Sequence, residues 1–128
     1  MKSSLLYAIF AIFIAGCAGI GGQPQPKDCG YAYQECLLPA EQSCTPAFGK
    51  LDNGQAIASE RILGPDGDIC NTEMEFESPA EIKGLSASCA FPKSVLIAMP
   101  TTDPDDISDL CTYCSGTMID QFKAGKLC

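Results

Sequence analysis

Alternating polar and apolar residues in the middle of the chain predict a β-sheet. Over residues 73–77, glutamates alternate with Met74 and Phe76, which is typical of a half-buried strand with an acidic outer face. A Gly-Pro-Asp-Gly sequence at 64–67 predicts a turn, because Pro and Gly occupy favoured turn positions. Pro92 predicts an edge or a break between two strands. The candidate strands are 55–63, 69–77, 81–85, 87–91 and 95–99.

Helical spacing appears on both sides of this region. After Asp28, a plausible helix N-cap, apolar residues recur on one helical face. Pro39 interrupts this pattern and should kink the helix or restart it near Leu38, and Thr45-Pro46 should end it. The residues of this face are Tyr33, Cys36, Leu37, Ala40 and Cys44.

A second helical segment is predicted near the C-terminus. Asp103 is the expected N-cap and Pro104 the first helical residue, with two further aspartates in the first turn. Gly116 is a point where the segment can divide, and Gly125 is a suitable C-terminal stop. The apolar stripe of this helix comprises Ile107, Leu110, Cys111, Cys114 and Met118.

The N-terminus has the pattern of a targeting segment. Lys2 precedes an unbroken apolar run over 5–15, which is shorter than the ~20 residues that a membrane-spanning helix needs. The run ends in Ile14-Ala15-Gly16-Cys17, which resembles the lipobox of prokaryotic lipoproteins. The resemblance implies a signal peptide over 1–16 and a lipidated, palmitate-type anchor on Cys17, followed by a flexible Gly/Pro tether over 17–27. An ordinary cleaved signal peptide and an uncleaved membrane anchor remain the alternatives.

Composition narrows the class of protein. Sixteen acidic residues against eight basic ones give the 128-residue chain a formal charge of −8. This charge argues against nucleic acid as a partner, because phosphate binding needs clustered Lys and Arg. The chain also has no His, the commonest general base and metal ligand.

Cysteine content indicates an oxidising compartment. Once Cys17 is set aside, an even number remains, which predicts a disulfide framework in an exported domain. Eight cysteines allow roughly a hundred pairings, so the connectivity stays open. We expect no metal site and no cofactor. The eight cysteines are Cys29, Cys36, Cys44, Cys70, Cys89, Cys111, Cys114 and Cys128.

Several short motifs resemble a family of small exported archaeal Cys-rich proteins of unknown function. The motifs are Asp28-Cys29-Gly30, then Cys36, then Cys44-Thr45-Pro46-Ala47, and later Ile82-Lys83-Gly84 with Cys89. The resemblance covers roughly 28–99. It implies an exported location and an α+β layout, and it carries no known activity.

Together these features predict one disulfide-stapled α+β domain over 28–128. We expect a short N-terminal helix, an antiparallel sheet of about four strands and one or two C-terminal helices. The expected protein is a non-enzymatic binding or envelope module. A lipid anchor would hold it at the cell membrane, facing the extracytoplasmic side, where it could meet an unknown protein partner.

Two other functions remain open. The Cys111-Thr112-Tyr113-Cys114 sequence is a CxxC motif, so a thiol-disulfide oxidoreductase is one alternative, although such a motif needs an exposed first cysteine at a helix N-terminus. An exported hydrolase inhibitor is the other, with candidate loops at 52–54 and 64–68. The many carboxylates are spread along the chain and single out no acid–base pair.

Overall fold

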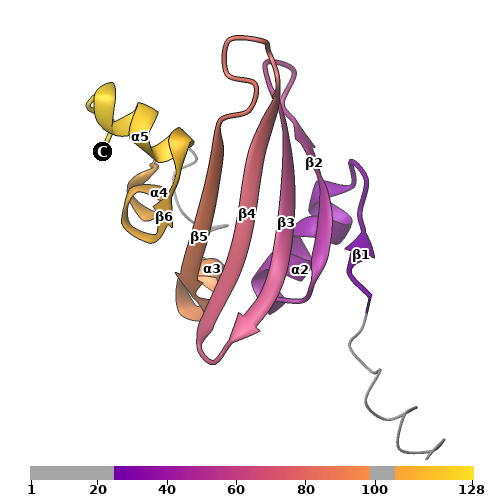
Figure 1. Cartoon of the computed structure of the whole chain (residues 1–128). Coiled ribbons are helices and arrows are strands. Elements are labelled where there is room, and N and C mark those ends of the chain that lie inside the picture. Colours follow the sequence, from indigo (N-terminus) through magenta and orange to yellow (C-terminus); the bar gives the residue numbers. More distant parts are fainter. Residues whose placement is uncertain (1–24, 99–105) are drawn as a thin grey trace, which may run out of the picture.

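A computed structural model describes residues 25–98 and 106–128. Its centre is a six-stranded sheet in the order β1-β2-β3-β4-β5-β6, with helices α2 and α3 behind it and α4 and α5 beside the β5 edge (Figure 1). The strands are β1 (Lys27–Asp28), β2 (Ala47–Asp52), β3 (Ile57–Asp66), β4 (Ile69–Ser78), β5 (Ser86–Pro92) and β6 (Cys114–Ser115). The helices are η1 (Tyr33–Leu37), α2 (Leu38–Ser43), α3 (Lys93–Ala98), α4 (Ser108–Tyr113) and α5 (Thr117–Ala124). The predicted α+β class is therefore confirmed.

The four long strands, β2 to β5, form consecutive antiparallel hairpins. Two short strands complete the edges: β1 pairs in parallel with β2, and β6 pairs antiparallel with β5. The long strands match the expected number, whereas β1, β2 and β6 were not predicted. Within β2, Gly49 stands where an apolar side chain would have made the alternation visible.

The core lies between the helices and the inner face of the sheet. Ala58 and Ile62 of β3 point to this face, as do alternate residues of β4 and β5. Leu37, Leu96 and Ile119 bring the helices onto it, and each is at most 1% exposed. The helices thus cover one face of the sheet, and no helix of the described residues covers the other.

The N-terminal helix restarts at Leu38, as the position of Pro39 predicted. A π-helical turn, η1, ends at Leu37, and α2 begins at Leu38 with Pro39 in its first turn, where a missing N–H costs no hydrogen bond. The prediction that Asp28 caps this helix is wrong. Asp28 belongs to β1, and its carboxylate accepts a hydrogen bond from the Gly30 N–H at 2.9 Å, so it shapes the turn before the helix.

The turn predicted at 64–67 and the strand predicted at 81–85 both differ from the structure. The expected turn at 64–67 is strand as far as Asp66, and the chain turns at 67–68 instead. Pro65 is tolerated there because β2 pairs with β3 only up to Ile62, so no β2 partner needs the missing N–H. The expected strand at 81–85 is wrong: residues 81–84 form a turn before β5, in which Gly84 has a φ of 88°.

The expected strand at 95–99 is the helix α3, as far as the structure describes it. A short apolar run fits either structure, and here packing decides, because α3 buries Leu96 and contacts α2. The Lys93 N–H donates to the Asp68 carbonyl at 2.9 Å and fixes the helix beside the β3–β4 turn.

The C-terminal helix is divided into two. Asp103 and Pro104 lie outside the described residues, and α4 begins later, at Ser108. The predicted single stripe is wrong because Cys114 leaves the helix and pairs with β5 as part of β6. Gly116 does divide the segment and Gly125 does end α5, as predicted. In the part of the chain described here, no helix is both long enough and apolar enough to cross a bilayer.

Candidate functional site

The structure joins all eight cysteines of the predicted framework in pairs. One bond ties the end of α2 to β4, one ties β5 to β6, one ties η1 to the residue after β1, and one ties α4 to the C-terminus. Cys17, the candidate lipidation site, lies outside the described residues. The pairs are Cys29–Cys36, Cys44–Cys70, Cys89–Cys114 and Cys111–Cys128.

The two cysteines of the CxxC motif belong to different disulfides. Cys111 bonds to Cys128 at the C-terminus, and Cys114 bonds to Cys89, its register partner across the β5–β6 pair. Cys111 is also the fourth residue of the six-residue helix α4, and so is not the first cysteine at a helix N-terminus that a redox motif needs. The geometry therefore gives no support to a redox pair at these positions.

The two loops considered for an inhibitor lie at hairpin ends. Asn53 follows β2, and its side-chain oxygen accepts hydrogen bonds from the N–H groups of Gln55 and Ala56, both at 2.9 Å. The other loop is mostly strand up to Asp66. Both hairpin ends are exposed, and no residue of 52–54 or 64–68 lines the cavity described next.

A cavity of about 320 Å³ lies on the inner face of the sheet, between η1 and α2 on one side and α4 and α5 on the other. Its walls are largely apolar, with Met74, Phe91, Leu110 and Met118 among them. Such a volume is within the lower range of small-molecule sites. We call this space the carboxylate cavity, because the acidic side chains that line it are Glu41, Glu60, Asp106 and Asp109.

Glu60 is the most unusual of these side chains. It projects from the inner face of β3, between Ala58 and Ile62, and is only 5% exposed. No described residue gives its carboxylate a hydrogen bond or an ion pair, and burial and a second carboxylate are the forces that act on it. The other buried polar side chain in the described residues, Thr72, lines the same cavity.

Burial changes the acidity of two glutamates. Loss of solvation raises the pKa of Glu60 to about 8, and the negative charge of Glu41 adds to the effect. Burial likewise raises the pKa of Glu41 to about 6. The pair therefore holds a proton near neutral pH, because two carboxylates in an apolar site cannot both be charged without a counter-charge.

The remaining polar groups around the pair are all neutral or anionic. Burial, followed by the charges of Glu41 and Glu60, raises the pKa of the Tyr33 phenol to about 12, so it stays protonated. Asp106 is exposed, and hydrogen bonds from Ser108 lower its pKa. No Lys or Arg of residues 25–98 and 106–128 lines the cavity, so its electrostatic character is negative.

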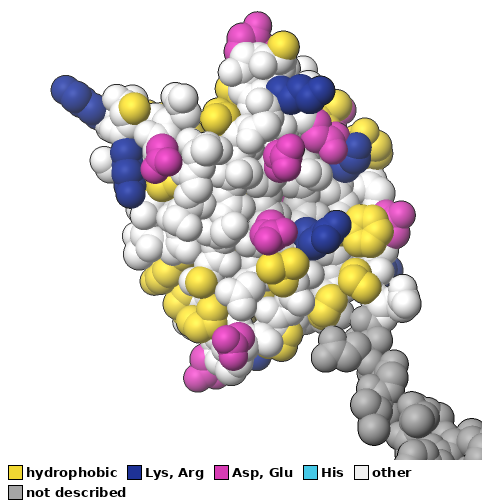
Figure 2. Space-filling view, in the orientation of Figure 1, with side chains coloured by type: hydrophobic (Ala, Val, Ile, Leu, Met, Phe, Trp, Pro, Cys, Tyr) yellow, Lys and Arg dark blue, Asp and Glu magenta, His cyan; other side chains and the backbone are white. Residues whose placement is uncertain are grey.

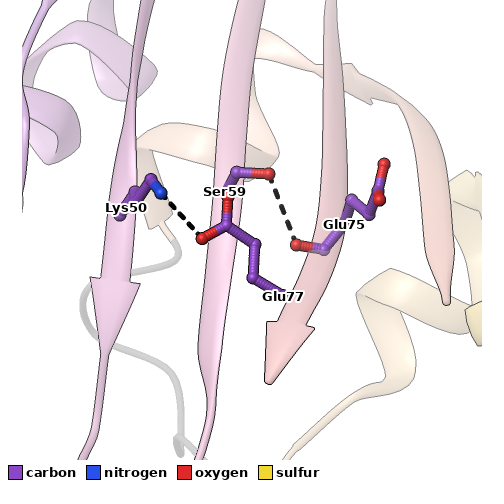
Figure 3. Close-up of polar contacts among 4 residues, drawn as sticks. All are labelled: Lys50, Ser59, Glu75 and Glu77. Carbon is purple, nitrogen blue, oxygen red and sulfur yellow. Dashed lines mark hydrogen bonds and ion pairs between the residues drawn. The ribbon is translucent and has the colours of Figure 1, made fainter. Parts of the chain in front are cut away.

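The opposite face of the sheet has a different character. Lys50 of β2 reaches across β3 to Glu77 of β4, with Nζ 2.8 Å from Oε2, and the Ser59 hydroxyl donates to the Glu75 carbonyl at 3.4 Å (Figure 3). Acidic and basic side chains alternate over this face, with a few hydrophobic ones between them (Figure 2). A broad depression of about 660 Å³ lies here. Its charges are exposed and partly paired, which is typical of a solvated surface.

Glu41 and Glu60 were not predicted as site residues, although the sequence around each carries a signal. Glu60 lies two residues from Ala58 and from Ile62, so a strand with these residues inside places a carboxylate inside as well. Glu41 lies four residues after Leu37, on the buried helical face. What no local pattern could give is the contact between them, because α2 and β3 meet only through the packing of the helix onto the sheet.

Comparison with known proteins gives no match to this chain among family models, curated proteins or solved structures.

Proposed function

We propose that the protein is a lipid-anchored extracytoplasmic binding module without enzymatic activity. One observation carries the proposal: all eight cysteines after Cys17 pair with one another inside the fold. Four disulfides in a small domain are typical of proteins in oxidising compartments, which supports export from the cytoplasm. The pairing uses all eight of these cysteines, so none of them is left to bond Cys17, which follows the apolar run in the sequence and is the proposed site of acylation.

The acidic surface supports a module held by its anchor alone. The formal charge of −8 would repel anionic lipid head groups, so we do not expect the domain itself to lie on the membrane. Two acyl chains on Cys17 would hold it at the membrane without a spanning helix. The carboxylate cavity then offers a place where the displayed domain could bind a ligand.

The anchor is tested by the mass of the mature protein from a prokaryotic host with a lipoprotein pathway. We expect cleavage before Cys17 and the added mass of acyl chains on that residue. Cys17→Ser should abolish both acylation and membrane retention, whereas Ala18→Ser, the matched control, should leave them unchanged. An unmodified Cys17 thiol in the mature protein, or a mature chain that begins beyond it, would refute the anchor.

A redox activity is tested on the same preparation. Because Cys111 and Cys114 are bonded to other cysteines, we expect the protein not to accelerate insulin reduction by dithiothreitol. The control is the double variant Cys111→Ala/Cys128→Ala, which leaves Cys89–Cys114 in place. Turnover at the rate of a disulfide oxidoreductase, absent from this variant, would replace the binding role with an enzymatic one.

A further inference from the structure

The carboxylate cavity presents an unpaired carboxylate to its open space, since no described side-chain N or O atom is both fully buried and without a partner. Glu60 is 5% exposed, faces the cavity and has no hydrogen-bond or ion-pair partner among the described residues. A buried carboxylate is costly unless it is neutral or paired with a cation. The described chain brings no cation to it, so a cation from outside would satisfy it.

We propose that the carboxylate cavity binds a small organic cation, with its ammonium, amidinium or guanidinium group between Glu41 and Glu60. The apolar part of the ligand would lie against Met74, Leu110 and Met118, which line the same space. This assignment rests on the proposed binding role but not on the lipid anchor.

The geometry favours an organic cation over a metal ion. Ca²⁺ takes six to eight oxygen ligands, and Mg²⁺ needs near-octahedral coordination. In the described ranges, 25–98 and 106–128, no three His, Cys, Asp or Glu residues gather in a way that could hold a metal. Two carboxylates against apolar walls instead match a ligand with one charged end and one hydrocarbon end, and an amidinium or guanidinium can donate to both.

The rim of the cavity favours the same charge. Asp106 lies exposed just before α4 and Asp109 lies half-buried within it, and both line the opening on that side. Fixed negative charges around a concave site attract cations and repel anions. The path to Glu60 is therefore lined by charges of the sign that a cationic ligand needs.

Binding must be linked to proton release. Near pH 7, Glu60 is mostly protonated, so a bound cation would displace its proton to the buffer. The other groups facing Glu60 are Glu41 of α2, the Tyr33 phenol of η1 and the two aspartates of the rim. The residues of β2, β4, β5 and α5 that line the cavity bring no group that titrates, since Cys89 is in a disulfide. Affinity for a cation should therefore rise between pH 6 and pH 9.

Three probes of one shape test the proposal: benzamidinium, neutral benzamide and benzoate. Each is titrated by calorimetry into the full mature protein in detergent, in two buffers of different ionisation enthalpy. We expect benzamidinium to bind at least about tenfold more tightly than benzamide, with benzoate weakest. At pH 7 the buffer dependence should show release of up to one proton per ligand.

Two variants locate the site. Glu60→Gln replaces the mostly protonated carboxyl by an amide of the same shape. It should weaken the binding of benzamidinium at least about tenfold and abolish the release of a proton. Glu73→Gln, an exposed change on the other face of β4, is the matched control and should change neither. Circular dichroism and thiol counting would reveal whether Glu60→Gln folds. If it does not, Glu41→Gln tests the same site at a half-buried position.

Equal affinity for benzamidinium and benzamide would overturn the proposal, as would equal loss in Glu60→Gln and Glu73→Gln. So would Ca²⁺ that binds more tightly than benzamidinium and displaces it, because the site would then be a metal site. The mass of Cys17 is measured on the same preparation. Failure of cation binding can therefore be told apart from failure of the anchor.

Discussion

A single buried glutamate gives the domain an unusual dependence on pH. Most acidic groups in proteins lie at the surface or are paired, whereas Glu60 is enclosed without a partner in the described chain. Because its folded pKa of about 8 is above the unfolded value of 4.5, the folded state holds the proton more tightly. This contribution to stability is fully present below pH 4.5 and is lost as the pH rises through 8.

We therefore expect the melting temperature to fall between pH 5 and pH 9. Glu60→Gln should remove most of this dependence and should stabilise the protein at pH 9 by up to about 5 kcal/mol, because an amide needs no deprotonation. Differential scanning calorimetry across this range measures both effects. Glu73→Gln should keep the slope of the parent, and a parent melting temperature that rises with pH would contradict the assignment.

One glycine permits the close approach of the C-terminal segment to the sheet. Gly116 has a φ of 121°, and a Cβ at this position would lie 2.6 Å from the Ser86 carbonyl oxygen. Gly116→Ala should cost about 1–3 kcal/mol, since both the backbone and the neighbouring strand would have to move. Chemical denaturation measures the loss. The matched control is Gly125→Ala, whose Cβ would meet nothing nearer than 3.4 Å at an ordinary φ of −80°.

Elements with a strong, uninterrupted pattern were predictable from the sequence. Glutamates that alternate with Met74 and Phe76 predicted β4, and Pro39 predicted where α2 begins. Elements set by tertiary contacts were not predictable. The alternating pattern of β2 is weakened by Gly49. The apolar run of α3 fits a strand equally well, and only the burial of Leu96 in the core makes it a helix. The carboxylate cavity belongs to the second kind, because it exists only where α2 and α4 meet the sheet.

The four disulfides differ in how far the elements shield them. Cys44–Cys70 joins the end of α2 to β4 in the core, where its two residues are 2% and 0% exposed. Cys111–Cys128 joins α4 to the C-terminus, and Cys128 is exposed. Access of a reductant should therefore follow the order of exposure.

A mild reductant followed by alkylation and peptide mapping should label Cys111 and Cys128 first. Cys44 and Cys70 should remain unlabelled until the protein unfolds, which makes them the internal control. After selective opening, the far-ultraviolet circular dichroism should change little, because the bond holds only the end of the chain beyond α5. Labelling of all eight cysteines at one rate would show that the disulfides open only by global unfolding.

At the scale of the whole molecule, crosslinks supplement a small core. Only fourteen hydrophobic residues of the described chain are buried, and four of them are cysteines. A domain of this size is stable by about 5–15 kcal/mol, and each disulfide contributes about 2–4 kcal/mol. The disulfides together are therefore comparable to the net stability.

Full reduction should consequently unfold or markedly loosen the domain. We expect loss of the cooperative thermal transition after reduction and alkylation under denaturing conditions, measured by calorimetry after return to native buffer. The control is protein carried through the same denaturation without reductant, which should refold. An unchanged melting temperature in the alkylated protein would show that the core suffices by itself.

The junction between the N-terminal segment and the sheet has a mechanical consequence. A pull on that segment first loads β1, whose hydrogen bonds to the next strand include Lys27 N–H to the Pro46 carbonyl at 3.1 Å and Cys29 N–H to the Phe48 carbonyl at 2.8 Å. Beyond β1, the Cys29–Cys36 bond keeps the seven-residue loop from being extended and passes the load directly to Cys36 in η1. The next crosslink along the chain, Cys44–Cys70, ties the end of α2 to β4, so a force on the N-terminal segment would reach the core of the sheet after only a short length of chain has been released.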